Sequence, residues 1–306
     1  MNPVFKKISF KLFKFSVRIL IVLCLLLLIG FAKEKYQFKV NKEHLNHKNI
    51  FIGDSHIQKS VDPTKFKQSI NIAQVSESFY YTFYKLKYLV DHEIRIKSVY
   101  FGVGYHSFSS YYDKYTFGKF SEDIRARYFY ILPFTENLTF CQSHFKTILD
   151  FSKSLISKNS KFYDAKDLNH TFLGGHTNFF VNSKLDTSYI KIRAKEQYFN
   201  ENKLCEISQV NTSYFDSIVS ICKRNQIKLT LISTPVHPYY DKCVPNYFKN
   251  YFFQKCKKSG CKLILFDSNH FNNDCFYKDG DHVTKKGGEK ITSELSLMRL
   301  PDLFIK

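Results

Sequence analysis

The fold is decided by the stretch NIFIGDSH at residues 49–56. Its β-branched and aromatic residues run directly into Gly-Asp-Ser, a pattern typical of a buried strand that ends in a tight turn and presents a hydroxyl group. We interpret Ser55 at this turn as a candidate nucleophile. The alternative is structural, because Gly, Asp and Ser often stand at strand ends to form the turn and cap the next helix.

The chain around this stretch alternates between strand and helix patterns. Runs of apolar and β-branched residues predict five strands, at 50–52, 70–75, 96–103, 227–233 and 262–266. Apolar stripes predict helices at 78–92, 207–223 and 247–257, with a last helix starting near Thr284. Strands separated in this way indicate an α/β fold, one doubly wound domain with a parallel sheet over residues 48–306. The aromatic-rich segment at about 105–200, with a helix at 143–156, is interpreted as an insertion.

The N-terminal region has the pattern of a membrane anchor. Basic residues at 6–18 precede an uncharged apolar run at 19–32. Positive residues before an apolar stretch keep the N-terminus in the cytoplasm, so we predict a basic tail and one transmembrane helix at 1–32. A charged linker at 33–47 would then lead to an extracytoplasmic domain, periplasmic or extracellular. The alternative is a signal peptide cleaved after GFA at 30–32, which would release a secreted domain.

The charge indicates which kind of partner to expect, and the cysteine spacing bears on metal binding and disulfides. The net charge is +19, but the lysines are scattered and no nucleic-acid-binding motif is present, so nucleic acid is not expected. A membrane surface or an acidic polymer fits diffuse positive charge better. The eight cysteines have no CxxC or zinc spacing, and neither a metal nor a cofactor is expected. The sequence does not decide whether one or two disulfides form, such as Cys243 with Cys256 or Cys261.

A second group of chemically active residues is the sequence DGDH at 279–282. An Asp three residues before a His allows one loop to supply both side chains, with the carboxylate holding one imidazole nitrogen while the other faces outward. A serine hydroxyl needs such a base to take its proton. Because the first strand end and a late loop both reach the carboxyl edge of an α/β sheet, we expect Ser55, His282 and Asp279 to meet there. Asp281 is the less favoured alternative to Asp279.

The sequences GDS at 53–55 and DGDH at 279–282 together resemble the first and last blocks of the SGNH or GDSL-like hydrolase family. The resemblance implies a flavodoxin-like three-layer fold. It also implies that Ser55 is the nucleophile, His282 the general base and Asp279 the carboxylate that orients the base.

The middle blocks of the family pattern are altered in this chain. Ser76 stands where the family has a Gly whose backbone N–H contributes to the oxyanion hole, and a Ser can still supply that N–H. The family's third-block Asn is absent from GVGYH at 102–106, so Tyr105 or His106 is predicted to donate, together with Ser55. The alternative function is a catalytically impaired protein of the same fold that binds or helps assemble an envelope polymer.

Further features are similar to a narrower group of proteins. GDSH followed by VDP at 61–63, the sequence NIA at 71–73 and the anchor resemble membrane-anchored proteins of envelope-polymer O-acylation, including the alginate acetylation and D-alanyl-lipoteichoic acid transfer proteins. This resemblance implies a protein that transfers or hydrolyses an acyl group, acetyl by preference, on an envelope or exported polysaccharide, and the bias toward Lys, Asn and Phe indicates a bacterial genome rich in A and T. The resemblance also implies a carbohydrate polymer or small acyl ester as substrate and a membrane-bound O-acyltransferase as partner.

Four residues in predicted turns or loops are weaker candidates for substrate contact: His56, His176, Asn178 and His237. A lone loop histidine more often caps a helix or lies at the surface, and that alternative is the more common one.

Overall fold

The computed structural model describes residues 45–298 except 119, 129–130, 134, 138–169, 172 and 178–183, together with scattered residues between 10 and 36. The predicted helix at 143–156, Asn178, and most of the predicted anchor and linker lie outside these residues. Within the part that is described, no helix is long and apolar enough to cross a membrane. The chain divides into two compact units, and the one that contains Ser55 comprises Glu43–Ile131 and Tyr163–Lys306.

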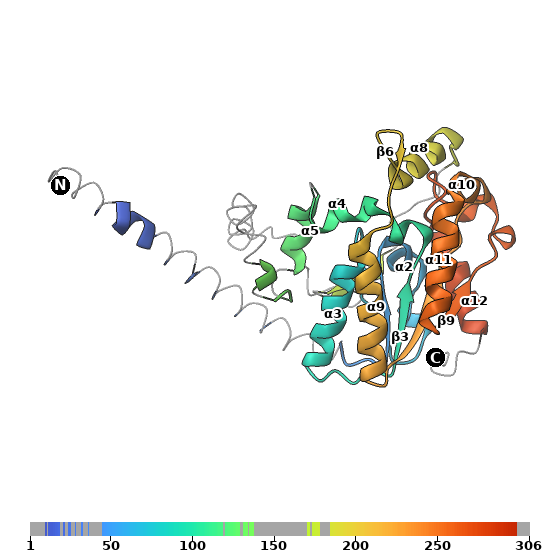
Figure 1. The fold of residues 1–306 in the computed structure, drawn as a ribbon. Coiled ribbons are helices and arrows are strands. Elements are labelled where there is room, and N and C mark those ends of the chain that lie inside the picture. Colours follow the sequence, from blue (N-terminus) through green and yellow to red (C-terminus); the bar gives the residue numbers. More distant parts are fainter. Residues whose placement is uncertain are drawn as a thin grey trace. The chain divides into compact units, whose positions relative to one another are not determined.

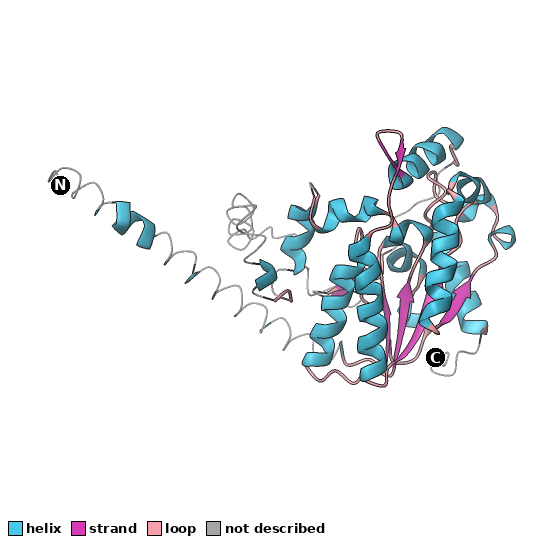
Figure 2. Cartoon of the chain, viewed as in Figure 1, coloured by secondary structure: helices cyan, strands magenta, loops and turns pink. Residues whose placement is uncertain are grey.

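A five-stranded parallel sheet forms the centre of this unit (Figures 1 and 2). Its strands are β1 (Asn49–Ile52), β2 (Ser69–Asn71), β3 (Ser98–Gly102), β8 (Lys228–Ser233) and β9 (Lys262–Leu265). They lie in the order β2-β1-β3-β8-β9, and each neighbouring pair is parallel. All residues of β1 and β3 are buried, as expected for strands covered on both faces. The five strands predicted from the sequence are therefore confirmed.

Strand β2 is shorter than predicted. The sequence suggested a strand to residue 75, but β2 ends at Asn71. The Asn71 side-chain nitrogen donates to the carbonyls of Ile57 and Val61 at 3.0 and 2.9 Å, and its side-chain oxygen accepts from the Ala73 amide at 3.0 Å. Beyond the strand, the amides of residues 72 and 74 still donate to the carbonyls of residues 51 and 53 at 2.9 and 3.0 Å, so the chain stays beside β1.

Helices cover both faces of the sheet and give a three-layer α/β arrangement. One set contains α3 (Phe79–Asp91), α9 (Gln209–Arg224) and α11 (Asn246–Ser259), which stand in front of the strands in Figure 1. The other contains α2 (Ser55–Ser60) and α12 (Lys285–Leu297), which pack against each other. The predicted helices at 78–92, 207–223 and 247–257 are confirmed, and Thr284 is the N-cap of α12.

The side chains of β3 alternate between the two faces of the sheet and pack into the core on both sides. Tyr100 faces α2 and α12 and stacks on Phe51 of β1, with ring centroids 4.9 Å apart. The next residue, Phe101, packs edge-on against Phe79 of α3 at 4.8 Å and contacts Phe215 of α9. Successive strand residues point to opposite faces, so a single strand supplies aromatic packing to both layers.

The segment between β3 and α9 adds elements that the sequence patterns did not show. They are the 3₁₀ helices η2 (Tyr105–Phe108) and η3 (Ser110–Tyr112), α4 (Asp113–Thr116), α5 (Ser121–Tyr128), β4 (His170–Thr171), β5 (Gly174–Gly175), α8 (Thr187–Tyr198), β6 (Phe199–Asn200) and β7 (Lys203–Leu204). A short helix α10 (Pro238–Cys243) follows β8. The cysteines in the described residues are free thiols, so the bridge from Cys243 to Cys256 or Cys261 does not form in this structure.

Replacing Gly174 by alanine is expected to lower the free energy of unfolding by about 3 kcal/mol. Gly174 has φ +132°, and a Cβ there would lie 2.4 Å from the Ile72 carbonyl oxygen and 2.8 Å from that of Ala73. The control is Gly260→Ala, at φ +68° with no atom within 4 Å of the new Cβ, for which a loss of about 1 kcal/mol is expected. Urea unfolding measures both, and equal losses would contradict the tight packing at β5.

Candidate active site

The turn after β1 places Ser55 at the carboxyl edge of the sheet. Gly53 has φ +138°, a conformation that favours glycine, and Asp54 then caps α2 by accepting the His56 amide N–H at 2.9 Å. Ser55 is consequently the first residue of α2. Asp54 therefore has the structural role of capping the helix, which was the alternative interpretation of this turn. The hydroxyl of Ser55 has a different partner.

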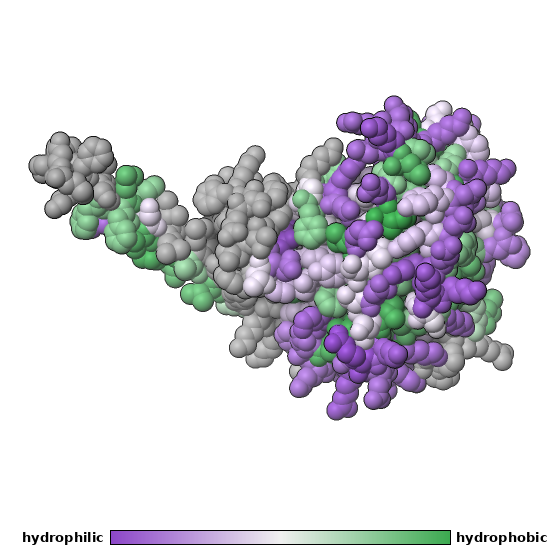
Figure 3. Space-filling view, viewed as in Figure 1, coloured by the Kyte–Doolittle hydropathy of each residue, from purple (hydrophilic) through white to green (hydrophobic). Residues whose placement is uncertain are grey.

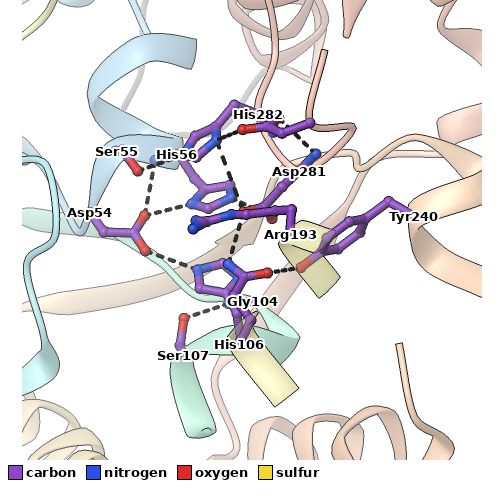
Figure 4. Close-up of polar contacts among 12 residues, drawn as sticks. Asp54, Ser55, His56, Gly104, His106, Ser107, Arg193, Tyr240, Asp281 and His282 are labelled. Atoms are coloured by element: carbon purple, nitrogen blue, oxygen red, sulfur yellow. Dashed lines mark hydrogen bonds and ion pairs between the residues drawn. The ribbon is translucent and has the colours of Figure 1, made fainter. Parts of the chain in front are cut away.

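A chain of hydrogen bonds joins Ser55, His282 and Asp279. The Ser55 hydroxyl lies 2.8 Å from Nε2 of His282, and Nδ1 of the same ring lies 2.8 Å from Oδ2 of Asp279. Figure 4 shows the serine and the imidazole facing each other across the sheet edge. All three residues are less than a tenth exposed. The arrangement has the geometry of a nucleophile, a base and the carboxylate that orients the base.

Backbone hydrogen bonds fix the loop that carries Asp279 and His282. Oδ1 of Asp279 accepts the amide N–H groups of Asp281 and His282 at 3.1 and 3.0 Å. The Tyr277 amide donates to the His282 carbonyl at 2.9 Å, and the His237 amide donates to the Gly280 carbonyl at 2.7 Å. Asp281 Oδ2 lies 4.0 Å from Nδ1 of His282, so Asp279, at 2.8 Å, is the carboxylate that holds the ring.

The surroundings favour the neutral form of the His282 imidazole. Burial lowers its pKa, Asp279 opposes that effect, and the neighbouring His56 lowers the pKa further, with a net decrease below the usual value of 6.5. A neutral imidazole with Nδ1–H on Asp279 leaves Nε2 free to accept the Ser55 proton. Near neutral pH, His282 is therefore in the neutral form that a general base requires.

A second buried network, centred on His56, lies directly against His282. Nδ1 of His56 is 3.0 Å from Oδ1 of Asp54, and Nε2 is 3.1 Å from Oδ1 of Asp281. His56 is 7% exposed and both ring nitrogens lie against carboxylates, so the ring has structural partners, while its contact with substrate stays a prediction. Burial lowers the pKa of His56, but Asp54 and Asp281 outweigh it and raise the pKa to about 10.

Helix α8 contributes two residues that the sequence analysis missed. Nε and Nη2 of Arg193 each lie 3.0 Å from Oδ2 of Asp281, and the Gln197 side-chain amide donates to the same oxygen at 2.8 Å. The Tyr240 hydroxyl in turn donates to Oε1 of Gln197 (Figure 4). Arg193 and Gln197 are four residues apart and therefore share a helix face, which was the one signal available in the sequence.

The predicted oxyanion donors have identifiable surroundings. Nε2 of His106 lies 2.9 Å from Oδ2 of Asp54, and the Tyr105 ring packs edge-on against Phe252 of α11. A donor role for either residue stays a prediction. Ser76 has φ +59°, the left-handed conformation that a glycine adopts most easily. The backbone at Ser76 thus has a glycine-like conformation, although its residue type differs.

The weaker loop candidates have local partners. His237 caps α10 by accepting the Tyr239 amide at 3.1 Å, and its Nε2 lies 3.2 Å from the Asn273 side chain. His176 Nδ1 lies 2.8 Å from the carbonyl oxygen of Gln58, which belongs to the same helix as Ser55. His237 is accordingly a capping residue, and His176 fixes its loop to α2.

Two groups in the described part of the chain bring potential metal ligands within 4.8 Å of one another: Asp54 with His56 and His106, and His56 with Asp281 and His282. A metal ion lies in the ring plane of each histidine that binds it. Here His56 stacks on His106 at 4.2 Å and 25°, and on His282 at 4.6 Å and 19°. Nearly parallel rings do not direct their nitrogens to one point, whereas their carboxylate contacts have hydrogen-bond lengths.

The chain matches no protein-family model, and no curated protein matches its sequence.

Proposed function

We propose that the protein is a serine-dependent enzyme that transfers or hydrolyses an acyl group, acetyl by preference, on a cell-envelope or exported polysaccharide. The observation that carries the proposal is the hydrogen-bond chain from Ser55 through His282 to Asp279. These residues come from opposite ends of the chain and meet in a buried cluster. Such a chain activates a hydroxyl for attack on an acyl carbon.

The topology supports a flavodoxin-like, doubly wound fold of the SGNH type. If the strands of the sheet are numbered along the chain, their order is 2-1-3-4-5, which is the order of that fold. Ser55 follows the first strand, and the loop with Asp279 and His282 follows the last. Ligands of open α/β sheets bind at this carboxyl edge, so the site lies where the fold class expects one.

The chemistry assigns one step to each side chain. The Ser55 oxygen attacks the carbonyl carbon of the ester while Nε2 of His282 takes the hydroxyl proton, and Asp279 stabilises the resulting imidazolium. The tetrahedral intermediate then expels the alcohol, which receives that proton from His282, and leaves an acyl-serine. Water completes hydrolysis, or a sugar hydroxyl completes transfer, after His282 has removed its proton. The backbone N–H groups of Ser55 and Ser76 are the proposed oxyanion donors.

A polyanionic substrate is supported by the charge of the protein. The net charge is +19, of which the five basic residues at 6–18 belong to the predicted cytoplasmic tail, and hydrophilic side chains cover much of the face seen in Figure 3. Distributed positive charge attracts a long acidic polymer without requiring one deep pocket. Attachment to the outer face of the membrane by residues 1–32, and a membrane-bound O-acyltransferase as partner, remain proposals from the sequence.

Acetate release from an acetyl ester is expected to increase with pH along a single acid limb whose midpoint lies below 6.5. Burial and His56 both lower the pKa of His282, and only its neutral form accepts the serine proton. The experiment measures initial rates of the full chain from pH 4 to 8 at constant ionic strength. A midpoint above 6.5, or a flat profile, would contradict His282 as the base in this environment.

One observation supports a second function, a binding or assembly role. The third-block Asn is absent, and Nε2 of the nearby His106 bonds to Asp54. In that case wild-type protein would retain an acidic polysaccharide on a column but release no acetate from it. Rates equal to those of a Ser55→Ala protein would favour this second function.

A further inference from the structure

The two contacts of the His56 ring determine its protonation state. An ionised carboxylate only accepts hydrogen bonds, and a neutral imidazole has one donor and one acceptor nitrogen. Nδ1 and Nε2 of His56 each face a buried carboxylate oxygen, on Asp54 and Asp281 respectively. Both nitrogens must therefore donate, which requires the imidazolium form.

Other groups around the two carboxylates keep them ionised. Asp54 also receives the Tyr112 hydroxyl at 2.6 Å and lies 2.9 Å from Nε2 of His106. Oδ2 of Asp281 also accepts hydrogen bonds from the side chains of Arg193 and Gln197. Burial raises the pKa of each carboxyl group. His56 and His106 together outweigh it at Asp54, and His56 and Arg193 outweigh it at Asp281, so both pKa values lie well below the usual range.

The imidazolium ring of His56 lies flat against the base. Its centroid is 4.6 Å from that of His282, with an interplanar angle of 19°. A positive charge at this separation disfavours a second positive charge on His282. We propose that His56 is a permanently protonated positioning residue, which fixes the plane of His282 and keeps that base neutral for the proposed acyl transfer. The effect of His56 on acyl transfer rests on the proposed function, whereas its charge and its stacking on His282 do not.

The same arrangement explains why two aspartates in one loop have different roles. Asp279 and Asp281 both lie close to His282, and two uncompensated carboxylates would favour its protonated form. His56 and Arg193 neutralise Asp281, whereas Asp279 bonds to the base itself. Among the described residues, Lys59 on α2 is a further charged group coupled to Asp279 and Asp54, and burial lowers its pKa to about 8 against their raising effects.

The first test measures the histidines directly in wild-type protein. Full-length chain carrying ¹³Cε1-labelled histidine is titrated by NMR from pH 5 to 9, and the His56 signal is assigned from a His56→Gln sample. We expect the His56 signal to keep its imidazolium shift to pH 8 at least, while His282 titrates below pH 6.5. A His56 signal that titrates between pH 5 and 8 would overturn the proposal, whether or not the protein has any esterase activity.

The second test removes the charge. In His56→Gln, loss of the cation and exposure of Asp281 to His282 act in the same direction, so the His282 titration is expected to move to higher pH. The rate of acetate release at pH 5.5, relative to its plateau, is expected to fall about tenfold. The matched control is His106→Gln, which removes a partner of Asp54 and a ring stacked on His56, but no ring stacked on His282. Its acid limb is expected to stay closer to that of wild type.

The outcomes separate this inference from the proposed function. Expected titrations of His56 and His282 without any acetate release support the positioning role and count against the enzyme. Acetate release with an unshifted His282 titration and acid limb in His56→Gln counts against the positioning role alone. Should the glutamine variant fail to fold, the His56 signal is assigned from its nuclear Overhauser effects to the His282 ring, whose centroid lies 4.6 Å away, and the wild-type titration then decides the charge of His56.

Discussion

Ser55→Ala is expected to reduce turnover of an acetyl ester by about 10⁴-fold or more. The hydroxyl is the only group of the proposed triad that forms a bond to the acyl carbon, and Nε2 of His282 at 2.8 Å is positioned to take its proton. Water activated by His282 could attack in its place, but without the covalent intermediate. The change removes one oxygen atom and should leave the fold intact.

A matched control is Ser220→Ala, an exposed serine on α9 that lies outside the site. Its turnover should equal that of the wild type within error. Initial rates of acetate release measure both variants, with thermal unfolding to show that each is folded. A Ser55→Ala protein that keeps the wild-type rate would remove the basis for serine catalysis.

Asp281→Ala is expected to lower the free energy of unfolding by about 3–5 kcal/mol at pH 7. Asp281 is 0% exposed and receives hydrogen bonds from His56, Arg193 and Gln197. Without its carboxylate, the cations of His56 and Arg193 remain close together and lose their shared counter-charge, while His56 keeps its contact with Asp54. The penalty comes from this uncompensated positive charge more than from the lost contacts.

The comparison is Asp216→Ala, which removes the partner of Lys255 on the surface, where the Asp216 side chain is 63% exposed. An exposed pair contributes at most about 1 kcal/mol, so this variant should be nearly as stable as wild type. Urea unfolding monitored by circular dichroism measures both. Similar small losses for the two variants would show that the Asp281 network is not charged as described.

The sequence predicted the parts of the fold that depend on local patterns. Apolar runs located all five strands, because a strand buried on both faces needs continuous apolar residues. Asp279 and His282 were predictable as a pair since they lie three residues apart in one loop. The bonds from the Asn71 side chain to Ile57 and Val61, at the end of β2, were not predictable because no local pattern relates these residues.

The second network could not be predicted because its members are far apart in the sequence. His56 and His106 each appeared as a lone histidine near a turn, and nothing local indicated that their rings would stack. Arg193 belongs to α8, whose helical pattern is weak and which lies in the segment that departs from the strand and helix alternation. Its contact with Asp281 spans 88 residues and arises only when α8 packs over the sheet edge.

The most direct measurement of the central claim is the site of reaction with a fluorophosphonate, located by peptide mass spectrometry on the full-length protein. The account predicts one fast adduct on Ser55 at pH 7, and a His282→Ala protein that keeps Ser55 but reacts with it at least about 100-fold more slowly. The absence of an adduct on Ser55, or a rate that His282→Ala leaves unchanged, would contradict a serine activated by this histidine.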